Sequence, residues 1–484
     1  MRVWRNIVLL VSSLVLSAAV FAEEPTLRAS LEVEYERTLG SPIPVETTEA
    51  KSGIDIQRGY LSYPPFATLD LFYGYQEGLF FHSVAEVRPQ YVGDAYLVDN
   101  LPPLGATGNP IMAENGVISR GIVAWRSTNL DFTLGRDGID YSGGLLGSIL
   151  PSPRIPYWDG FHLETRIGQL GMQWMVSSIR ARRAYAGLDV DPNAGGDISS
   201  PGYPDYGWED SATGSPTLIL ETFHRFSWDF GGFVLGGSGH ALYSRRNNRI
   251  EFIDILPLVS WHQTQLLETN MSIIMDGRWT PQPGLSAAFQ IGLDDANSGL
   301  IGIRDSEVVT ISAFVGGIEW KPPENAFTLY GEAGYTHVLW GNFDGSTPSI
   351  PYVNTLSRAI YRYPVDSGAL LLPLTSPYGP GARWARLVAT LDRGLKGFQT
   401  GLDFLFLLKT EAANLVTTAY FTGISATEAS HAVSFASFEC FVSYEWEGVA
   451  VKVTPAMNYR DGKTGFFASF AIGYRFGGPA LFKY

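Results

Sequence analysis

The chain has 484 residues and a formal net charge of −14, and only 17% of its residues are charged, against roughly 25% in an ordinary soluble protein. The acidic balance argues against a nucleic-acid-binding protein, whose binding surface is usually basic. The single cysteine excludes a disulfide framework and a zinc site built from cysteines. After the first two dozen residues no apolar run reaches the ~18 residues of a membrane-spanning helix.

The first 22 residues have the features of a secretory signal peptide. Arg2 and Arg5 precede an uncharged, largely apolar run that ends in a small residue at Ala22. The run is short and acidic residues follow it at once, which speaks against a membrane anchor. We therefore expect cleavage after Ala22, export of the chain, and a single domain comprising residues 23–484.

Beyond this segment, apolar residues alternate with polar or small ones, which is the pattern of β-strands with two different faces. The alternation begins at 27–36 and is clearest at 439–446, 449–459 and 466–476. The last three segments are joined by two tight turns, Glu447-Gly448 and Arg460–Lys463, that are typical of hairpins. Further strands are predicted over Leu69–Tyr75, Gly78–Val87, Val117–Trp125, Gly171–Arg180, Leu218–Phe226, Met271–Thr280, Val308–Trp320, Phe327–Val338 and 398–407.

These segments predict an all-β fold, namely an antiparallel transmembrane β-barrel of about 18 strands (roughly 16 to 20) with no helical domain of note. Strands of ~10 residues fit a tilted crossing of a bilayer, and backbone groups in lipid require a closed barrel. A soluble sandwich or propeller would not explain a polar second face along the whole chain. Aromatic residues at strand ends are expected to form girdles at the two interfaces: Tyr63, Tyr73, Trp125, Trp228, Trp279, Trp320, Tyr330, Trp384, Trp446 and Tyr459.

Long irregular regions interrupt the strands at Val98–Asn115, Tyr185–Pro216 and Trp340–Gly381. Bacterial barrels have short periplasmic turns and longer extracellular loops. We therefore expect these long loops to be extracellular, where they either form a ligand surface or fold into the lumen as a constriction.

The second long loop contains a weak candidate for a calcium site. Its oxygen-bearing side chains have calcium-loop spacing, but Ala194 stands where the EF-hand needs Gly, and Ser200 replaces its closing Glu. A solvated acidic loop is the better interpretation, so we predict no metal site. The candidate ligands are Asp189, Asp191, Asn193 and Asp197.

No pattern of catalytic residues emerges. The seven His residues lack metal-ligand spacing, and the segment 236–240 lacks the Gly-x-Ser-x-Gly spacing of a nucleophile elbow. Cys440 falls on the apolar face of its strand, as a small packing residue does. We expect a protein without enzymatic activity and without a cofactor.

Three stretches, taken in order, resemble the Wzi-type capsule-assembly outer-membrane proteins. The first comprises Gly135-Arg136, residues 147–150 and an aromatic loop at 156–161. The second runs from Met275-Asp276 through a Pro-Gly turn to Asp294-Asp295. The third is 373–380, where Gly381 replaces the Asp that is usual in the family.

The resemblance implies an 18-stranded barrel that acts as an outer-membrane lectin and holds exported polysaccharide at the cell surface. The early first strand leaves little room for the periplasmic helical bundle of the best-known members. Aromatic faces and planar polar groups hold sugars, so the residues implied to bind glycan are Arg136, Trp158, Asp159, Asp276, Asp294, Asp295 and Tyr378.

Two other functions remain open. A diffusion porin would use the polar inner face and a loop constriction, with a mild preference for cations if the acidic charge faces the pore. A surface adhesin is a third possibility. The expected partners are outer-membrane lipid, surface polysaccharide and the outer-membrane assembly machinery, with no nucleic acid.

Overall fold

The computed structural model describes residues 26–40, 65–75, 77–87, 89–90, 112–113, 117–155, 157–178, 208–210, 215–245, 250–255, 269–295, 310–322, 327–341, 360–365, 368–391, 397–410 and 432–476. The predicted signal peptide and the calcium-loop candidates Asp189, Asp191, Asn193 and Asp197 lie outside the described residues. So do most of the loops Val98–Asn115 and Tyr185–Pro216.

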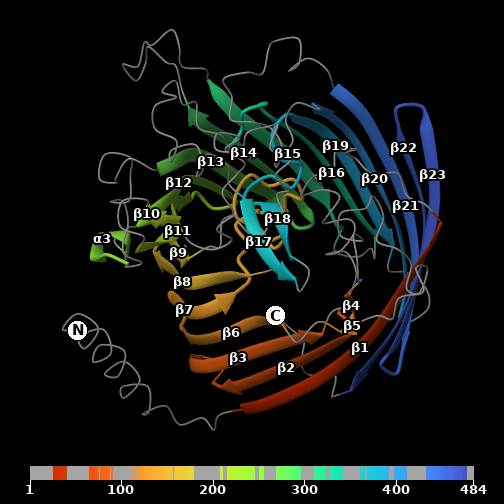
Figure 1. Ribbon diagram of the computed structural model, residues 1–484, viewed down its shortest axis with the longest axis horizontal. Helices are drawn as coiled ribbons and strands as arrows, with labels where there is room; N and C mark the ends of the chain where they lie inside the picture. Colours follow the sequence, from red (N-terminus) through yellow and green to blue (C-terminus); the bar gives the residue numbers. More distant parts are fainter. Residues whose placement is uncertain are drawn as a thin grey trace.

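The described strands form one closed antiparallel barrel, which confirms the predicted fold class. Eighteen strands make the barrel, and it closes where β1 pairs with β23, from Leu31 opposite Phe476 to Gly40 opposite Phe467. The view down the barrel in Figure 1 shows the strands following one another around the wall in chain order. The barrel strands are β1 (Thr26–Gly40), β2 (Ala67–Gly74), β3 (Gly78–Val87), β6 (Val117–Arg126), β7 (Leu130–Asp137), β8 (Trp158–Ile167), β9 (Leu170–Ser178), β11 (Ser215–Asp229), β12 (Phe233–Arg245), β13 (Thr269–Gln282), β14 (Leu285–Asp295), β15 (Ile311–Trp320), β16 (Phe327–Thr336), β19 (Ala382–Leu391), β20 (Phe398–Thr410), β21 (Ala432–Trp446), β22 (Val449–Arg460) and β23 (Lys463–Phe476).

A few short elements stand outside this wall. One short strand pairs with the first residues of β11. Two further pairs of short strands form separate two-stranded sheets. The described helix has four residues, and no helix in the described part of the chain is long and apolar enough to cross a membrane. The elements are β4 (Pro89–Gln90), β5 (Met112–Ala113), β10 (Trp208–Asp210), α3 (Phe252–Ile255), β17 (Ile360–Val365) and β18 (Gly368–Pro373).

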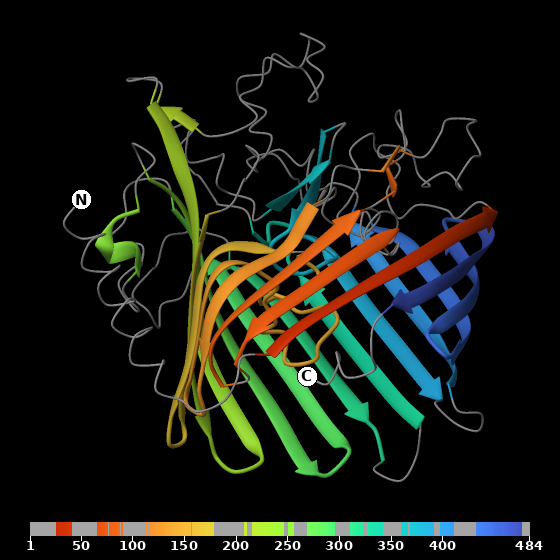
Figure 2. The same ribbon diagram turned by 90° about the horizontal axis from the view of Figure 1, so that it is seen from below.

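The two ends of the barrel differ in their connections. Tight turns join β6 to β7, β8 to β9, β11 to β12, β13 to β14 and β21 to β22 at one end, which we call the short-turn end. Most connections at the other end are long (Figure 2). Both predicted hairpins are confirmed, because Glu447 and Asp461 have φ values of 47° and 44°, as two-residue hairpin turns require. In bacterial barrels the short turns face the periplasm.

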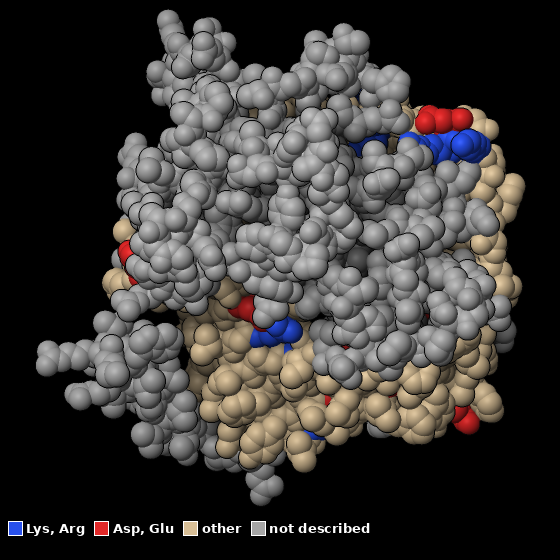
Figure 3. Space-filling view, in the orientation of Figure 1, with Lys and Arg blue, Asp and Glu red and all other residues tan. Residues whose placement is uncertain are grey.

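Apolar side chains point outward along the barrel strands, and this is the alternation that predicted them. On β23, Ile472, Tyr474 and Phe476 are exposed, while Gly473 and Arg475 between them face inward. Charged groups are also sparse on the described part of the long-connection face (Figure 3). The outward-facing apolar side chains of the strands suit contact with lipid.

The aromatic girdle is confirmed in part. Trp279, Trp320 and Trp446 are about half exposed and lie close to the short-turn end. Trp384 and Tyr330 were predicted for the girdle, but this is wrong. Trp384 is only 4% exposed and, like Tyr330, hydrogen-bonds to the carboxylate of Glu332 on the inner face of the wall. A buried N–H or O–H needs a polar partner, and the lumen provides one where lipid does not.

Candidate functional site: a plug in the barrel lumen

The connection between β7 and β8, residues 138–155, folds into the barrel instead of standing outside it, where Figure 1 shows it crossing the lumen. Ile149 and Leu150 on this β7–β8 loop are completely buried. They belong to a core cluster that also includes inward-facing wall residues such as Ile274, Val315 and Phe435. Apolar burial of this extent is the main force that holds the loop inside the barrel.

Gln290 on β14 fixes the backbone of the β7–β8 loop. Its Oε1 accepts hydrogen bonds from the Ile149 N–H at 2.8 Å and from the Ser148 hydroxyl at 3.1 Å, and its Nε2 donates to the Ser142 carbonyl at 2.9 Å. Gln290 is 1% exposed, so these bonds form away from water. One wall side chain therefore forms hydrogen bonds with three buried groups of the loop.

Glu332 on β16 makes the second attachment. Its carboxylate accepts hydrogen bonds from the Gly147 N–H at 3.0 Å and from Trp384 Nε1 at 2.8 Å. The hydroxyl of neighbouring Tyr330 donates to the same carboxylate and accepts from the Leu146 N–H at 3.1 Å. A Cβ at Gly147 would lie 2.6 Å from Glu332 Oε1 and 2.7 Å from the Trp384 ring, so only glycine allows this approach.

Two further segments, 337–341 and 374–381, complete a plug together with the β7–β8 loop. Trp340 Nε1 donates to Thr375 Oγ1 at 3.0 Å, and the Gly341 N–H donates to Asp294 Oδ2 at 2.9 Å. Lys409 on β20 donates to the Pro380 carbonyl. These contacts involve both ends of the predicted long loop Trp340–Gly381, so these two ends fold into the lumen. Folding into the lumen was one of the two alternatives predicted for this loop.

Burial shifts the ionisation of several plug residues. It raises the pKa of the Tyr141 and Tyr378 hydroxyls above the usual value of 10, and lowers the pKa of the Arg154 guanidinium below its usual 12.5. The Tyr378 ring also contacts the Trp384 ring, with 4.7 Å between the centroids. Both tyrosines are therefore neutral at physiological pH and pack through their rings.

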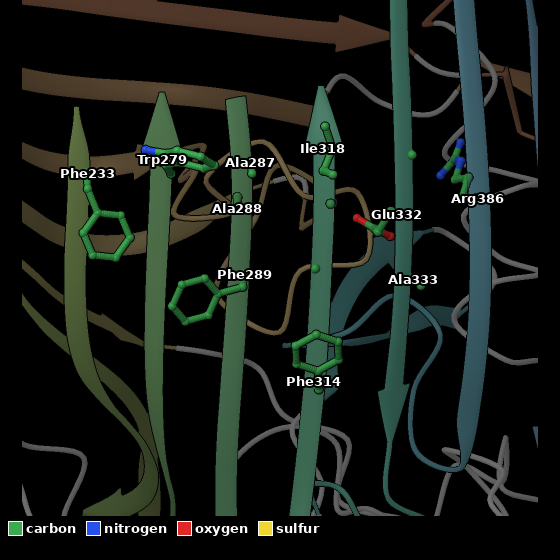
Figure 4. Close-up of a pocket in the computed structure, with 13 residues that line it drawn as sticks. Phe233, Trp279, Ala287, Ala288, Phe289, Phe314, Ile318, Glu332, Ala333 and Arg386 are labelled. Carbon is green, nitrogen blue, oxygen red and sulfur yellow. The ribbon is translucent and has the colours of Figure 1, made fainter. Parts of the chain in front are cut away.

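Figure 4 shows the wall to which much of the plug is attached. Glu332 and Arg386 are cross-strand partners on β16 and β19. Phe289 and Phe314 line a hollow of about 1080 Å³ on this wall, together with small residues such as Gly331. The exposure of Phe314 and Ile318 places most of this hollow on the exterior of the barrel, where lipid is expected.

Polar and charged side chains that face the lumen pair with side chains of other strands. Arg225 on β11 reaches past β12 and binds both carboxylate oxygens of Asp276 on β13 at 2.6 to 3.1 Å, and its Nη1 donates to Gln173 at 2.9 Å. Further pairs between strands include Arg120–Asp137, Arg386–Asp403, Arg475–Glu32 and His82–Asp70. Bidentate Arg–carboxylate pairs are strong and directional, so they fix the inner wall as well as neutralising it.

The structure brings together two of the seven predicted glycan-binding residues. Arg136 at the end of β7 binds both oxygens of Asp159 on β8 at 2.6 and 2.9 Å. The Arg136 guanidinium also lies 3.8 Å above the Tyr157 ring. This Arg136–Asp159 pair remains partly exposed, at 29% and 40% of the two side chains.

The other predicted residues are held elsewhere. Asp276 is bound by Arg225, Asp294 accepts from the plug, and Tyr378 is 3% exposed within it. Trp158 is 2% exposed and, with Asp159, begins strand β8, so their prediction as part of a loop is wrong. The strand starts there because both residues pair with β7. Asp295 ends β14 at an irregularity opposite Ile311.

The residues that hold the plug, chiefly Gln290 and Glu332, were not among the predicted site residues. The sequence did contain a signal for the plug, because four apolar residues lie close together in a Gly- and Ser-rich segment, and an exposed loop would not favour them. These residues are Leu145, Leu146, Ile149 and Leu150. Within the described residues, no group of three or more His, Cys, Asp or Glu could hold a metal ion.

No protein-family model and no curated protein matches the chain. Among solved structures it is similar to Escherichia coli Wzi, described as an outer-membrane protein involved in group 1 capsule assembly and as a carbohydrate-binding β-barrel. The two share 13% identity over 98% of this chain and 88% of that chain, with a TM-score of 0.52. The fold is that of an outer-membrane β-barrel.

Two Pseudomonas aeruginosa proteins are also similar to this barrel. OccK2 (OpdF), solved in complex with glucuronate, shares 12% identity over 93% of this chain and 98% of its own, with a TM-score of 0.45. OccD3 (OpdP) shares 11% identity over 94% and 92%, also with a TM-score of 0.45.

Proposed function

We propose that this outer-membrane barrel binds exported surface polysaccharide and catalyses no reaction. The observation that carries the proposal is the plug, in which buried apolar side chains hold three segments inside the lumen and the bonds to Gln290 and Glu332 fix the β7–β8 loop. A rigid plug suits a barrel that presents a binding surface better than one that conducts solutes. The fold it shares with a carbohydrate-binding β-barrel supports the same proposal.

The proposed glycan-binding surface lies at the long-connection end, around the Arg136–Asp159 pair and Tyr157. A sugar needs planar hydrogen-bonding groups, and this pair offers them with part of each charged side chain exposed. The Tyr157 ring is 3% exposed and lies beneath the Arg136 guanidinium, so it holds that group in place rather than touching the sugar. Asp276, Asp294 and Tyr378 would then support the plug rather than touch the polymer, because their side chains are already engaged inside the barrel.

The test uses the mature chain, refolded in detergent and immobilised, with the organism's own surface polysaccharide as the probe. We expect retention of the polymer by the wild-type barrel and about a tenfold loss in Arg136→Gln, the equivalent of about 1.4 kcal/mol. Arg475→Gln is the matched control, because Arg475 also pairs with a carboxylate at similar exposure, but near the short-turn end. Equal retention by both variants would contradict the assigned surface.

A diffusion porin is the second candidate, and one observation favours it. Glu32, Glu34 and Glu36 alternate along β1 with outward-facing Leu31 and Tyr35, so the lumen side of β1 is acidic. Conductance in planar bilayers, recorded on the same sample, separates the two functions. Steady ohmic channels with cation preference and no retained polysaccharide would establish the porin and overturn the lectin proposal.

A further inference from the structure

The lumen contains a polar pocket at the short-turn end, far along the strands from the Arg136–Asp159 pair. Its volume is about 270 Å³, and it is formed by the turn at 127–129 and by the adjoining ends of β7, β8, β9, β11 and β12. Lining side chains with polar groups include Asn129, Glu164, Gln169, Gln173 and Ser227. Because the short turns face the periplasm in bacterial barrels, the pocket opens toward that side.

The charged groups of the pocket are already paired. Arg225 is bound by Asp276 and Gln173, and Arg166 is bound by Asp229. Asp131, which also lines the pocket, accepts from Arg126 at 2.7 Å. An anionic ligand would have to displace a carboxylate from Arg225 or Arg166, at a cost in free energy, so the pocket favours an uncharged ligand over an anion.

Hydrogen-bonding capacity remains for such a ligand. Glu164 accepts from Gln173 at 3.1 Å through one carboxylate oxygen, and a carboxylate has about four acceptor sites. The side-chain amides of Asn129 and Gln169 each carry donors and an acceptor at the exposed rim. Hydroxyl groups both donate and accept, so a ligand that bears several of them matches this mixed lining.

We propose that this pocket binds a single neutral sugar residue that reaches the barrel from its short-turn end. This inference rests on the proposed function, because it assigns to the same glycan-binding protein a second sugar site on the other side of the plug. The pocket adjoins the plug through a continuous contact path. Glu164 contacts His162, whose ring lies 5.6 Å from the plug residue Tyr141, and Tyr141 stacks on Phe223, two residues before Arg225.

The experiment uses saturation-transfer NMR on the full mature barrel in detergent. The probes are glucose, galactose, mannose and N-acetylglucosamine, with glucuronate as the charged comparison. Ser227→Phe is designed to fill the pocket, since Ser227 lines it from β11. Ser443→Phe is the matched control, because Ser443 faces the lumen near the short-turn end of β21, and residues of this strand do not line the pocket.

We expect saturation transfer to at least one neutral sugar, a weaker signal from glucuronate, and about a tenfold loss in Ser227→Phe with no change in Ser443→Phe. A signal that survives Ser227→Phe, or no signal from any neutral sugar, overturns the pocket. Retention of the intact polysaccharide, measured on the same variants, is the separate readout for the proposed function. Loss of the pocket signal in Ser227→Phe, without polymer retention by wild type, would support the pocket and overturn the surface function.

Discussion

The side-chain oxygen of Gln290 lies 2.8 Å from the backbone nitrogen of Ile149, and both residues are almost completely buried between the barrel wall and the plug. The bond joins a strand residue to a loop residue, and two more bonds from the same side chain surround it. Gln290 therefore fixes the position of the plug relative to the rigid barrel wall.

Replacing Gln290 by leucine should loosen the plug. The Ile149 N–H would then be buried without a partner, which costs about 1–3 kcal/mol, enough to shift the equilibrium from the docked toward an undocked state about fivefold to 150-fold. We expect more frequent channel openings in planar bilayers. Gln399→Leu on β20 is the control, since Gln399 faces the lumen near the short-turn end. Unchanged openings in the Gln290 variant would show that apolar packing alone holds the loop.

Removal of the central part of the β7–β8 loop tests whether it blocks the lumen. Replacing residues 143–152 by a short Gly-Ser linker removes the buried Leu145, Ile149 and Leu150 but leaves every barrel strand intact. We expect a larger single-channel conductance, with the folded barrel still resistant to SDS at low temperature on a gel. A folded variant with the conductance of the wild type would mean that the loop does not occlude the lumen.

Gly236 on β12 is predicted to be intolerant of a side chain. A Cβ there would lie 2.6 Å from Arg225 Nη2 and 2.7 Å from Asp276 Oδ1. Gly236→Ala should lower the free energy of unfolding by about 1–3 kcal/mol through this overpacking, as measured by guanidinium titration in detergent. Gly237→Ala is a close control, because nothing lies within 4 Å of its added Cβ. Equal stability of the two variants would contradict the prediction.

Acidification should loosen the plug at His337. Burial lowers the pKa of His337 below its usual 6.5, and its Nδ1 accepts from the Leu339 N–H at 3.2 Å. As the pH falls, His337 gains a proton in the unfolded segment before it does so in the folded one. The folded segment therefore has its full stability above pH 6.5 and loses stability as the pH falls below that value. Limited proteolysis at pH 7.5 and pH 5 measures this. His337→Asn keeps an acceptor that does not titrate, and it should remove the pH dependence.

The strands were predictable because lipid and lumen impose opposite chemistry on alternate residues. The pattern at 466–476 needed no distant information, since each outward side chain contacts lipid and each inward one the lumen. Trp384 and Tyr330 broke the rule because Glu332 on the inner face of the wall provides a polar partner for their donors.

The plug was not predictable in the same way. Its loop lies far in sequence from the strand residues that hold it, as with Ile149 and Gln290 or Gly147 and Glu332. Local pattern shows that Leu145, Ile149 and Leu150 avoid water, but not which surface covers them. The pairing of Arg136 with Asp159 likewise depends on the register between β7 and β8, which neither strand specifies alone.

The pairing of β1 with β23 has a consequence for how the molecule is made. Leu31 lies opposite Phe476, so the edge of the first strand has no partner until the last strand has been synthesised. A growing chain would expose that edge, together with every outward apolar side chain, throughout translation and transit. The barrel can therefore close only after β23 is complete.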